Sequence, residues 1–215
     1  EKWPDRLVVP VAAVVREVPA VDVVVRPGIT YQTIIGFGGY DPRDQAEMLV
    51  NDLGLSAHRD HIECEINPGS KVGWNRLREL YDLGVRVFMA TPWSPAPSYK
   101  WINNCSGTDH KWNRLSNGLG PYNDYRHPNA DHEKGGLPNY YPAFADGLVG
   151  YVQEFERQVP GAQLTAISPQ NECYFALTYP SCVYEINTST GVNQLRDIIW
   201  ELGTRLEDAG LGRVK

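Results

Sequence analysis

The chain has 215 residues, of which 42% are hydrophobic and 21% charged, so its composition is that of a globular protein and not of a disordered one. Its formal net charge of −6 argues against a nucleic-acid partner, because phosphate binding requires a basic surface. No stretch approaches the roughly 20 apolar residues of a membrane-spanning helix, so no membrane span is expected.

The first elements are predicted to be β-strands. Residues 21–25 (VDVVV) are mostly β-branched and precede the turn sequence RPG at 26–28. A second strand at 31–35 (YQTII) is predicted to run into a loop at 36–39 (GFGG), whose glycines would permit unusual backbone angles. This loop lacks the third glycine of a dinucleotide-binding fingerprint, so no nucleotide cofactor is expected.

Helices and strands then alternate. Apolar spacing predicts four helices, at about 42–54, 74–84, 144–159 and 192–206. Strands are predicted near 57–62, 85–90 and 164–168, with a long loop near 91–138. Strands that alternate with helices indicate βα units on a parallel sheet.

The predicted fold class is therefore α/β, and the four βα units correspond to about the first half of a (β/α)8 TIM barrel, which takes ~250 residues. Residues 31–215 are assigned to this half-barrel, and residues 1–30 to a β segment of a side domain. A C-terminal half of the barrel, beyond Lys215, is expected as a partner. The 215 residues alone are expected to be inactive.

The first candidate site is residues 167–172 (ISPQNE), at the end of the fourth predicted strand. Working residues of βα barrels lie at such strand ends. Glycoside hydrolysis requires a carboxylic acid that protonates the leaving oxygen, for which Glu172 is the candidate, and an amide such as Asn171 can bind the sugar 2-hydroxyl. From spacing alone, a solvated loop glutamate is the commoner case.

The second candidate is residues 92–95 (PWSP), at the end of the third predicted strand. The indole of Trp93 would offer a flat surface to the apolar side of a pyranose. The alternative is a tryptophan that packs under the long loop. Tyr174 and Tyr179 could likewise extend a sugar platform or pack within their own loop.

The cysteines and sequons favour an extracellular protein. The chain has four cysteines without a CxxC spacing, so a zinc ribbon is not indicated: Cys64, Cys105, Cys173 and Cys182. Asn104 and Asn187 each begin a glycosylation sequon. A disulfide between Cys173 and Cys182 could close a short loop, although the pairing remains open.

A metal centre is not expected. Four side chains of the long loop match no zinc motif: His110, His127, Asp131 and His132. Glu63 and Glu65 follow the second predicted strand, but a catalytic pair in a retaining glycosidase must stand ~5–5.5 Å apart across the anomeric centre, which makes them poor candidates for a nucleophile.

Taken together, four segments resemble glycoside hydrolase family 30, in clan A of the retaining β-glycosidases. They occur in the family's order and cover most of the chain from Val21 onward: YQTI with GFGG at 31–39, LGLS with Arg59, PWSPAP at 92–97 and ISPQNE at 167–172. The Trp-Ser-Pro and Gln-Asn-Glu motifs make the resemblance specific.

The resemblance implies roles for individual residues. Glu172 would be the general acid/base, Asn171 would contact the sugar 2-hydroxyl, and Trp93 would form part of the subsite wall. Arg59, on the second strand, would orient the carboxylates. The family's nucleophile is a glutamate on the seventh strand, which lies outside this sequence.

The sequence departs from the family at two positions and in the length of one connection. Ile35 stands where the family usually has aspartate, and Cys173 where it usually has proline after the catalytic glutamate. The stretch between the second and third strands is also short, which leaves the substrate subsites on that side open.

The expected function is hydrolysis of β-glycosidic bonds in a polysaccharide of the xylan, β-1,6-glucan or β-1,6-galactan type. The enzyme would be secreted, would retain the anomeric configuration by double displacement, and would use no cofactor. The alternative is a catalytically inactive half-barrel that acts as a carbohydrate-binding or interaction module.

Overall fold

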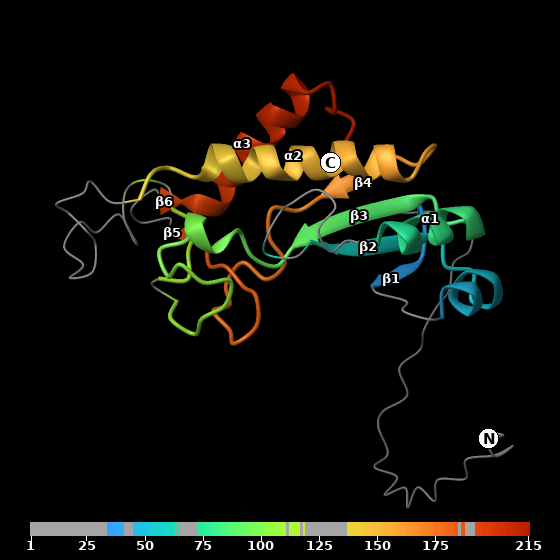
Figure 1. The fold of residues 1–215 in the computed structure, drawn as a ribbon, viewed down its shortest axis with the longest axis horizontal. Helices are drawn as coiled ribbons and strands as arrows, with labels where there is room; N and C mark the ends of the chain where they lie inside the picture. Colours follow the sequence, from blue (N-terminus) through green and yellow to red (C-terminus); the bar gives the residue numbers. More distant parts are fainter. Residues whose placement is uncertain are drawn as a thin grey trace, which may run out of the picture. The chain divides into compact units, whose positions relative to one another are not determined.

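A computed structural model describes residues 34–40, 45–62, 64, 73–110, 112–116, 118, 137–184, 186–187 and 192–215 (Figure 1). The expected side-domain segment at 1–30 lies outside the described residues. The chain from Ile34 to Lys215 clusters as one compact unit, and the following description concerns this unit.

A four-stranded parallel sheet is the centre of the fold. Its strands are neighbours in chain order: β1 (Gly38–Tyr40), β2 (Ala57–Ile62), β3 (Val87–Pro92) and β4 (Leu164–Ile167). Parallel neighbours require a crossover between them, which explains why a helical segment separates consecutive strands. The predicted α/β class with a parallel sheet is therefore confirmed.

The position of β1 corrects the sequence-based expectation. The strand lies on Gly38–Tyr40 and so begins inside the expected loop at 36–39, while Ile34 and Ile35 of the expected strand are exposed, irregular chain. The remainder of that expected strand, residues 31–33, lies outside the described residues. None of the described glycines at 36–39 has a positive φ. Gly38 is needed for another reason: a Cβ atom there would lie 2.0 Å from the carbonyl oxygen of Ala57, so only glycine lets β1 approach β2.

The helices confirm most of the predicted periodic segments. They are a short π-helix, η2 (Met48–Asp52), and three α-helices, α1 (Trp74–Leu83), α2 (Tyr141–Gln158) and α3 (Gln194–Asp208). Helix α1 ends at Gly84, whose φ of 122° a side chain would oppose. Helix α3 begins at Asn193, whose side chain accepts a hydrogen bond from the Arg196 amide.

Shorter elements occur within the connections. A 3-10 turn, η3 (Pro97–Tyr99), follows β3. An antiparallel ribbon of β5 (Ile186–Asn187) and β6 (Val192–Asn193) precedes α3.

The apolar core lies between the sheet and the helices. Figure 1 shows how these elements are arranged. Phe88 of β3 packs against Phe155 of α2, with their ring centroids 5.3 Å apart, and both side chains are almost fully buried. Trp74 of α1 contacts Tyr151 of α2, which in turn donates a 2.5 Å hydrogen bond to Asp60 of β2. Because residues 58, 60 and 62 of β2 face the helices, alternation turns Arg59 and His61 to the other side of the sheet.

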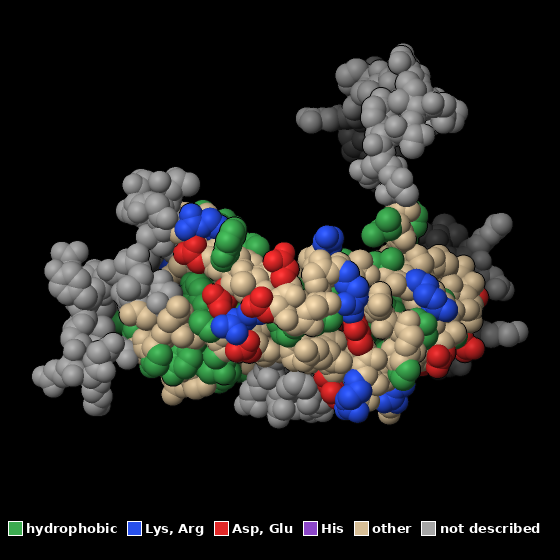
Figure 2. All heavy atoms as spheres, turned by 90° about the horizontal axis from the view of Figure 1, so that it is seen from above, with side chains coloured by type: hydrophobic (Ala, Val, Ile, Leu, Met, Phe, Trp, Pro, Cys, Tyr) green, Lys and Arg blue, Asp and Glu red, His purple; other side chains and the backbone are tan. Residues whose placement is uncertain are grey.

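The outer faces of α2 and α3 carry ion pairs. Figure 2 shows acidic and basic side chains interspersed on this surface. Arg205 of α3 pairs with Asp146 of α2, and Arg213 pairs with Glu156. Such partly exposed pairs contribute little to stability, typically about 0–1 kcal/mol each.

The chain also hydrogen-bonds along the second edge of β4. The amide of Lys215 donates to the carbonyl of Thr165 at 3.0 Å, and the amide of Ile167 donates to the carbonyl of Lys215 at 2.8 Å. This is the ladder pattern of a parallel neighbour, so Lys215 occupies the position of a fifth strand. Within the described ranges, no helix combines the length and apolarity that crossing a bilayer requires.

Candidate active site

The loops that follow β2, β3 and β4 meet at the carboxyl edge of the sheet. The ladder continues beyond the strands, because the amide of Trp93 donates to the carbonyl of Ile62 at 3.2 Å and the amide of Asn171 donates to the carbonyl of Pro92 at 3.0 Å. These two bonds bring the Trp-Ser-Pro and Gln-Asn-Glu segments together, at the edge where barrel enzymes place their catalytic groups.

Gln170 joins the two segments through its side chain. It is 5% exposed, and its amide nitrogen donates a 2.9 Å hydrogen bond to the carbonyl oxygen of Trp93. No role was predicted for this residue from the sequence. Its position between a buried proline and Asn171 gives no sign that it bonds across the sheet.

Four aromatic side chains form a cluster at this edge: Tyr40, His61, Trp93 and Tyr179. The Trp93 ring stacks on His61 with centroids 4.8 Å apart and lies 5.3 Å from Tyr179 and 6.5 Å from Tyr40. The Tyr40 hydroxyl and Nδ1 of His61 are 2.8 Å apart. This aromatic cluster includes side chains from the ends of β1 and β2 and from the loops after β3 and β4. Trp93 was predicted from the sequence and Tyr179 was one of two alternatives for its loop, whereas Tyr40 and His61 were not predicted.

Glu172 lies beside this cluster on the loop after β4. Its carboxylate is exposed, and Oε2 accepts a 2.8 Å hydrogen bond from the Tyr179 hydroxyl. That hydrogen bond raises the pKa of Tyr179, because it stabilises the protonated phenol beside a carboxylate. Since the Tyr179 ring contacts Trp93, the acidic group and the indole belong to one site. Asn171 precedes Glu172 and is half-buried.

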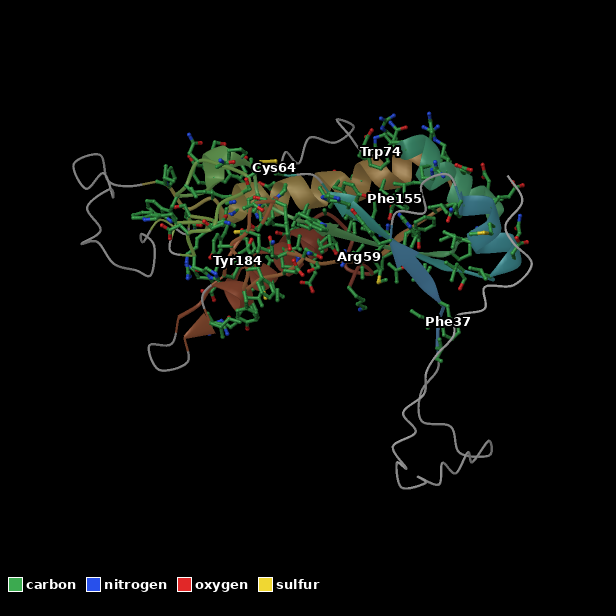
Figure 3. The ribbon with its side chains drawn as sticks, turned by 90° about the horizontal axis from the view of Figure 1, so that it is seen from below. Phe37, Arg59, Cys64, Trp74, Phe155 and Tyr184 are labelled. Atoms are coloured by element: carbon green, nitrogen blue, oxygen red, sulfur yellow. A yellow bond between two sulfur atoms is a disulfide. The ribbon has the colours of Figure 1, made fainter. Side chains whose placement is uncertain are left out.

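Arg59 contacts the aromatic cluster at a different point. Its guanidinium carbon lies 5.3 Å from the centre of the Tyr40 ring, a cation–π arrangement (Figure 3). Among the described residues it makes no ion pair with Glu172. Its expected role in orienting carboxylates therefore stays a prediction.

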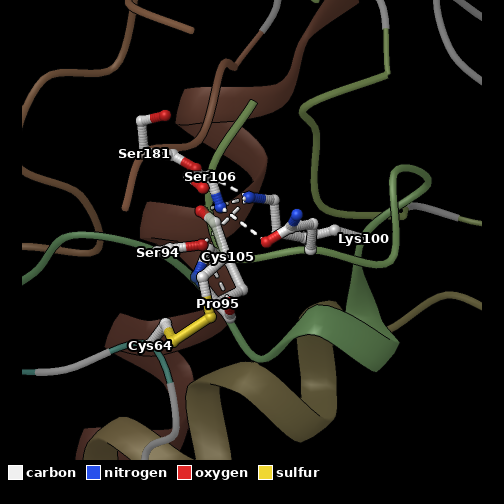
Figure 4. The surroundings of a disulfide bond; sticks show 8 residues. Cys64, Ser94, Pro95, Lys100, Cys105, Ser106 and Ser181 are labelled. Carbon is white, nitrogen blue, oxygen red and sulfur yellow. Dashed lines mark hydrogen bonds between the residues drawn. A yellow bond between two sulfur atoms is a disulfide. The ribbon is translucent and has the colours of Figure 1, made fainter. Parts of the chain in front are cut away.

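A buried lysine fixes the loops that carry the site. Lys100 is fully buried, and its ammonium group donates to Ser94 Oγ at 3.0 Å, to the Cys105 carbonyl at 2.9 Å and to the Ser181 carbonyl at 2.7 Å (Figure 4). Burial lowers its pKa to about 8, and the neighbouring Cys182 opposes this effect. Ser94 follows Trp93, so Lys100 connects the loop after β3 with the loop that carries Tyr179.

The disulfide differs from the suggested pairing of Cys173 with Cys182. Cys64 and Cys105 are bonded, with their Cα atoms 5.8 Å apart (Figure 4). Cys173 and Cys182 are free thiols. Cys182 is fully buried beside Lys100 and Tyr184, and burial raises the pKa of its thiol. The short separation of Cys173 and Cys182 in sequence made their pairing plausible. The loop after β3 instead brings Cys105 to Cys64.

No group of three or more potential metal-ligating His, Cys, Asp or Glu side chains is present in the described part of the chain. Of the side chains considered as ligands, His127, Asp131 and His132 lie outside that part, as do Glu63 and Glu65.

Comparisons with known proteins give a likeness of fold. No protein-family model matches the chain, and no curated protein matches it. Among solved structures, the catalytic domain of GH30 xylanase C from Talaromyces cellulolyticus is similar, with a TM-score of 0.63 and 21% sequence identity over 88% of this chain and 47% of that one. SrfJ from Salmonella typhimurium is similar with a TM-score of 0.57 and 20% identity, over 86% of this chain and 43% of that one.

The chain thus spans less than half of the length of these two solved structures. At such identities the likeness concerns the fold alone. The parallel sheet, its helices and their order resemble the corresponding part of a glycoside hydrolase family 30 catalytic domain.

Proposed function

We propose that this chain forms the acid/base half of the catalytic domain of a retaining β-glycosidase of the family 30 type. The observation that carries the proposal is the position of Glu172. Its exposed carboxylate lies at the carboxyl edge of the sheet and is hydrogen-bonded to Tyr179, whose ring contacts Trp93. The likeness of fold to a GH30 xylanase catalytic domain supports the same function.

The chemistry proceeds in two steps. Protonated Glu172 donates its proton to the leaving glycosidic oxygen while a second carboxylate attacks the anomeric carbon. The resulting carboxylate of Glu172 then removes a proton from the water that hydrolyses the glycosyl-enzyme. The second carboxylate would be a glutamate outside these 215 residues, on the half-barrel that continues beside β4. Asn171 would contact the sugar 2-hydroxyl, and Trp93 would border the subsite.

The proposed substrate is a β-linked polysaccharide of the xylan, β-1,6-glucan or β-1,6-galactan type. Flat aromatic faces suit sugar rings, which have one apolar side, and Tyr40 and Tyr179 of the aromatic cluster are exposed. The proposed location is extracellular, because Cys64 and Cys105 form a disulfide, and disulfides persist mainly in oxidising compartments.

A carbohydrate-binding role without catalysis is the second candidate. The aromatic cluster favours it, since stacking on a sugar requires no carboxylate. The two candidates predict different effects of removing the Glu172 carboxylate. In an enzyme, its removal would abolish turnover of substrates with poor leaving groups. In a binding module, it would leave the affinity for sugar largely unchanged.

The test replaces the carboxylate in the protein encoded by the complete gene. Glu172→Gln should lower kcat on the polysaccharide by roughly 10²–10⁴-fold, the usual contribution of a general acid/base, while activated 2,4-dinitrophenyl glycosides keep most of their glycosylation rate. Azide should accelerate turnover of the activated substrate by Glu172→Ala and yield a β-glycosyl azide, since an anionic nucleophile needs no base.

Glu207→Gln is the matched control, because it removes the same charge from an exposed position on α3. Equal losses of Glu172→Gln on activated and unactivated substrates would overturn the acid/base role. Wild-type binding of polysaccharide without any hydrolysis would favour the binding module.

A further inference from the structure

The Tyr179 hydroxyl donates the one hydrogen bond that the Glu172 carboxylate receives from the described residues, at 2.8 Å. Glu172 is exposed, and a glutamate side chain with three rotatable bonds samples many orientations unless something holds it. An acid/base residue must instead present one oxygen to the reacting bond in a fixed direction. The Tyr179 hydroxyl bonds to Oε2 of Glu172 and leaves Oε1 of the same carboxylate available.

Tyr179 is itself well supported. Its ring contacts Trp93 at 5.3 Å. The adjacent Pro180 forms a β-bridge with Ser106, and the amide of Ser181 donates to the carbonyl of Cys105 at 3.1 Å. The loop that carries Tyr179 is thus attached to the segment that the disulfide and Lys100 hold in place.

We infer that Tyr179 is a positioning residue for Glu172, orienting its carboxyl group through Oε2 so that Oε1 faces the leaving oxygen. This inference rests on the proposed role of Glu172.

The substitution that isolates the hydroxyl is Tyr179→Phe, which keeps the ring against Trp93. We expect kcat on the polysaccharide to fall about 10-fold with KM changed less than about twofold, because orientation is lost and the subsite wall is kept. A tyrosine that only lines the subsite would instead raise KM and leave kcat near the wild-type value.

Tyr99→Phe is the matched control, since it removes a phenol hydroxyl from a ring that stacks on Tyr140 and does not contact Glu172. It should leave kcat and KM unchanged. A second readout compares leaving groups: because a misoriented carboxyl group impairs proton donation, Tyr179→Phe should slow the polysaccharide more than the activated 2,4-dinitrophenyl glycosides, which need little protonation.

The failures are distinguishable. If Glu172→Gln shows the leaving-group dependence of an acid/base but Tyr179→Phe keeps the wild-type kcat on the polysaccharide, only the role of Tyr179 is overturned. If Glu172→Gln does not lower kcat on the polysaccharide, the proposed function is overturned, and the positioning role of Tyr179 is overturned with it.

Discussion

The Lys100 ammonium group donates a 2.7 Å hydrogen bond to the carbonyl oxygen of Ser181, and so attaches the loop after β3 to the loop after β4. Its other two acceptors are Ser94 Oγ and the Cys105 carbonyl, so all three acceptors are uncharged. A buried cation is costly unless it is fully hydrogen-bonded, and Lys100 uses every donor it has.

Replacing this group should destabilise the protein. In Lys100→Met the side chain keeps its approximate length, but three buried acceptors lose their donor, and we expect the free energy of unfolding to fall by about 2–4 kcal/mol. Urea denaturation followed by circular dichroism measures the change. Arg157→Met is the control: it removes a charge from an exposed ion pair on α2 and should cost less than about 1 kcal/mol. Equal effects of the two substitutions would mean that the Lys100 contacts add nothing.

Lys100 also predicts a pH dependence of stability. Burial lowers its pKa from 10.5 to about 8 in the folded protein. Between pH 8 and 10.5 the unfolded chain therefore holds a proton that the folded protein has released, so this group makes the free energy of unfolding rise with pH in that window. Below pH 8 both states are protonated and its contribution is constant.

The difference in unfolding free energy between the wild type and Lys100→Met should accordingly grow by about 2–3 kcal/mol from pH 7.5 to 10.5, at about 1.4 kcal/mol per pKa unit. Denaturation curves at four pH values in this range measure it. Repeating them in a Cys182→Ala background removes the titration of the neighbouring thiol. A difference that stays constant with pH would contradict a lowered pKa of Lys100.

Local patterns predicted much of the fold. The periodic residues of α2 and the β-forming run of β2 were found from sequence because a helix face and a strand are properties of a short segment. The position of β1 was not found, because it depends on the carbonyl of Ala57, which approaches Gly38 from a different strand. From sequence alone, the glycines at 36–39 are typical of a loop, because their contact with Ala57 is not visible in the local pattern.

The residues of the candidate site likewise fall into those that local patterns predict and those that depend on tertiary contacts. Trp93, Asn171 and Glu172 follow strands, and parallel topology alone places the ends of neighbouring strands together. The contacts of Lys100, Gln170 and Tyr179 arise from how irregular loops fold over one another. A lysine is normally exposed, so no local pattern predicts that Lys100 is buried among carbonyl groups.

The cysteine pairing predicts which thiols react with an alkylating reagent. Under native, non-reducing conditions iodoacetamide should modify Cys173 and leave Cys182 protected, because Cys182 is fully buried and burial raises its thiol pKa. Denaturation should expose both, and only reduction should release Cys64 and Cys105, as peptide mass mapping would show. A crosslinked peptide containing Cys173 and Cys182 would contradict this pairing.

The same bond should contribute to stability. It joins residues 41 apart in sequence, for which chain entropy predicts a loss of about 4 kcal/mol in the Cys64→Ser/Cys105→Ser double variant. Cys173→Ser removes a thiol without opening a loop, and should change the unfolding free energy by less than about 1 kcal/mol. Because Ser106 and Cys105 hold the loop of Tyr179, the double variant should also lose more activity than Cys173→Ser, and unchanged activity would show that this loop keeps its position without the disulfide.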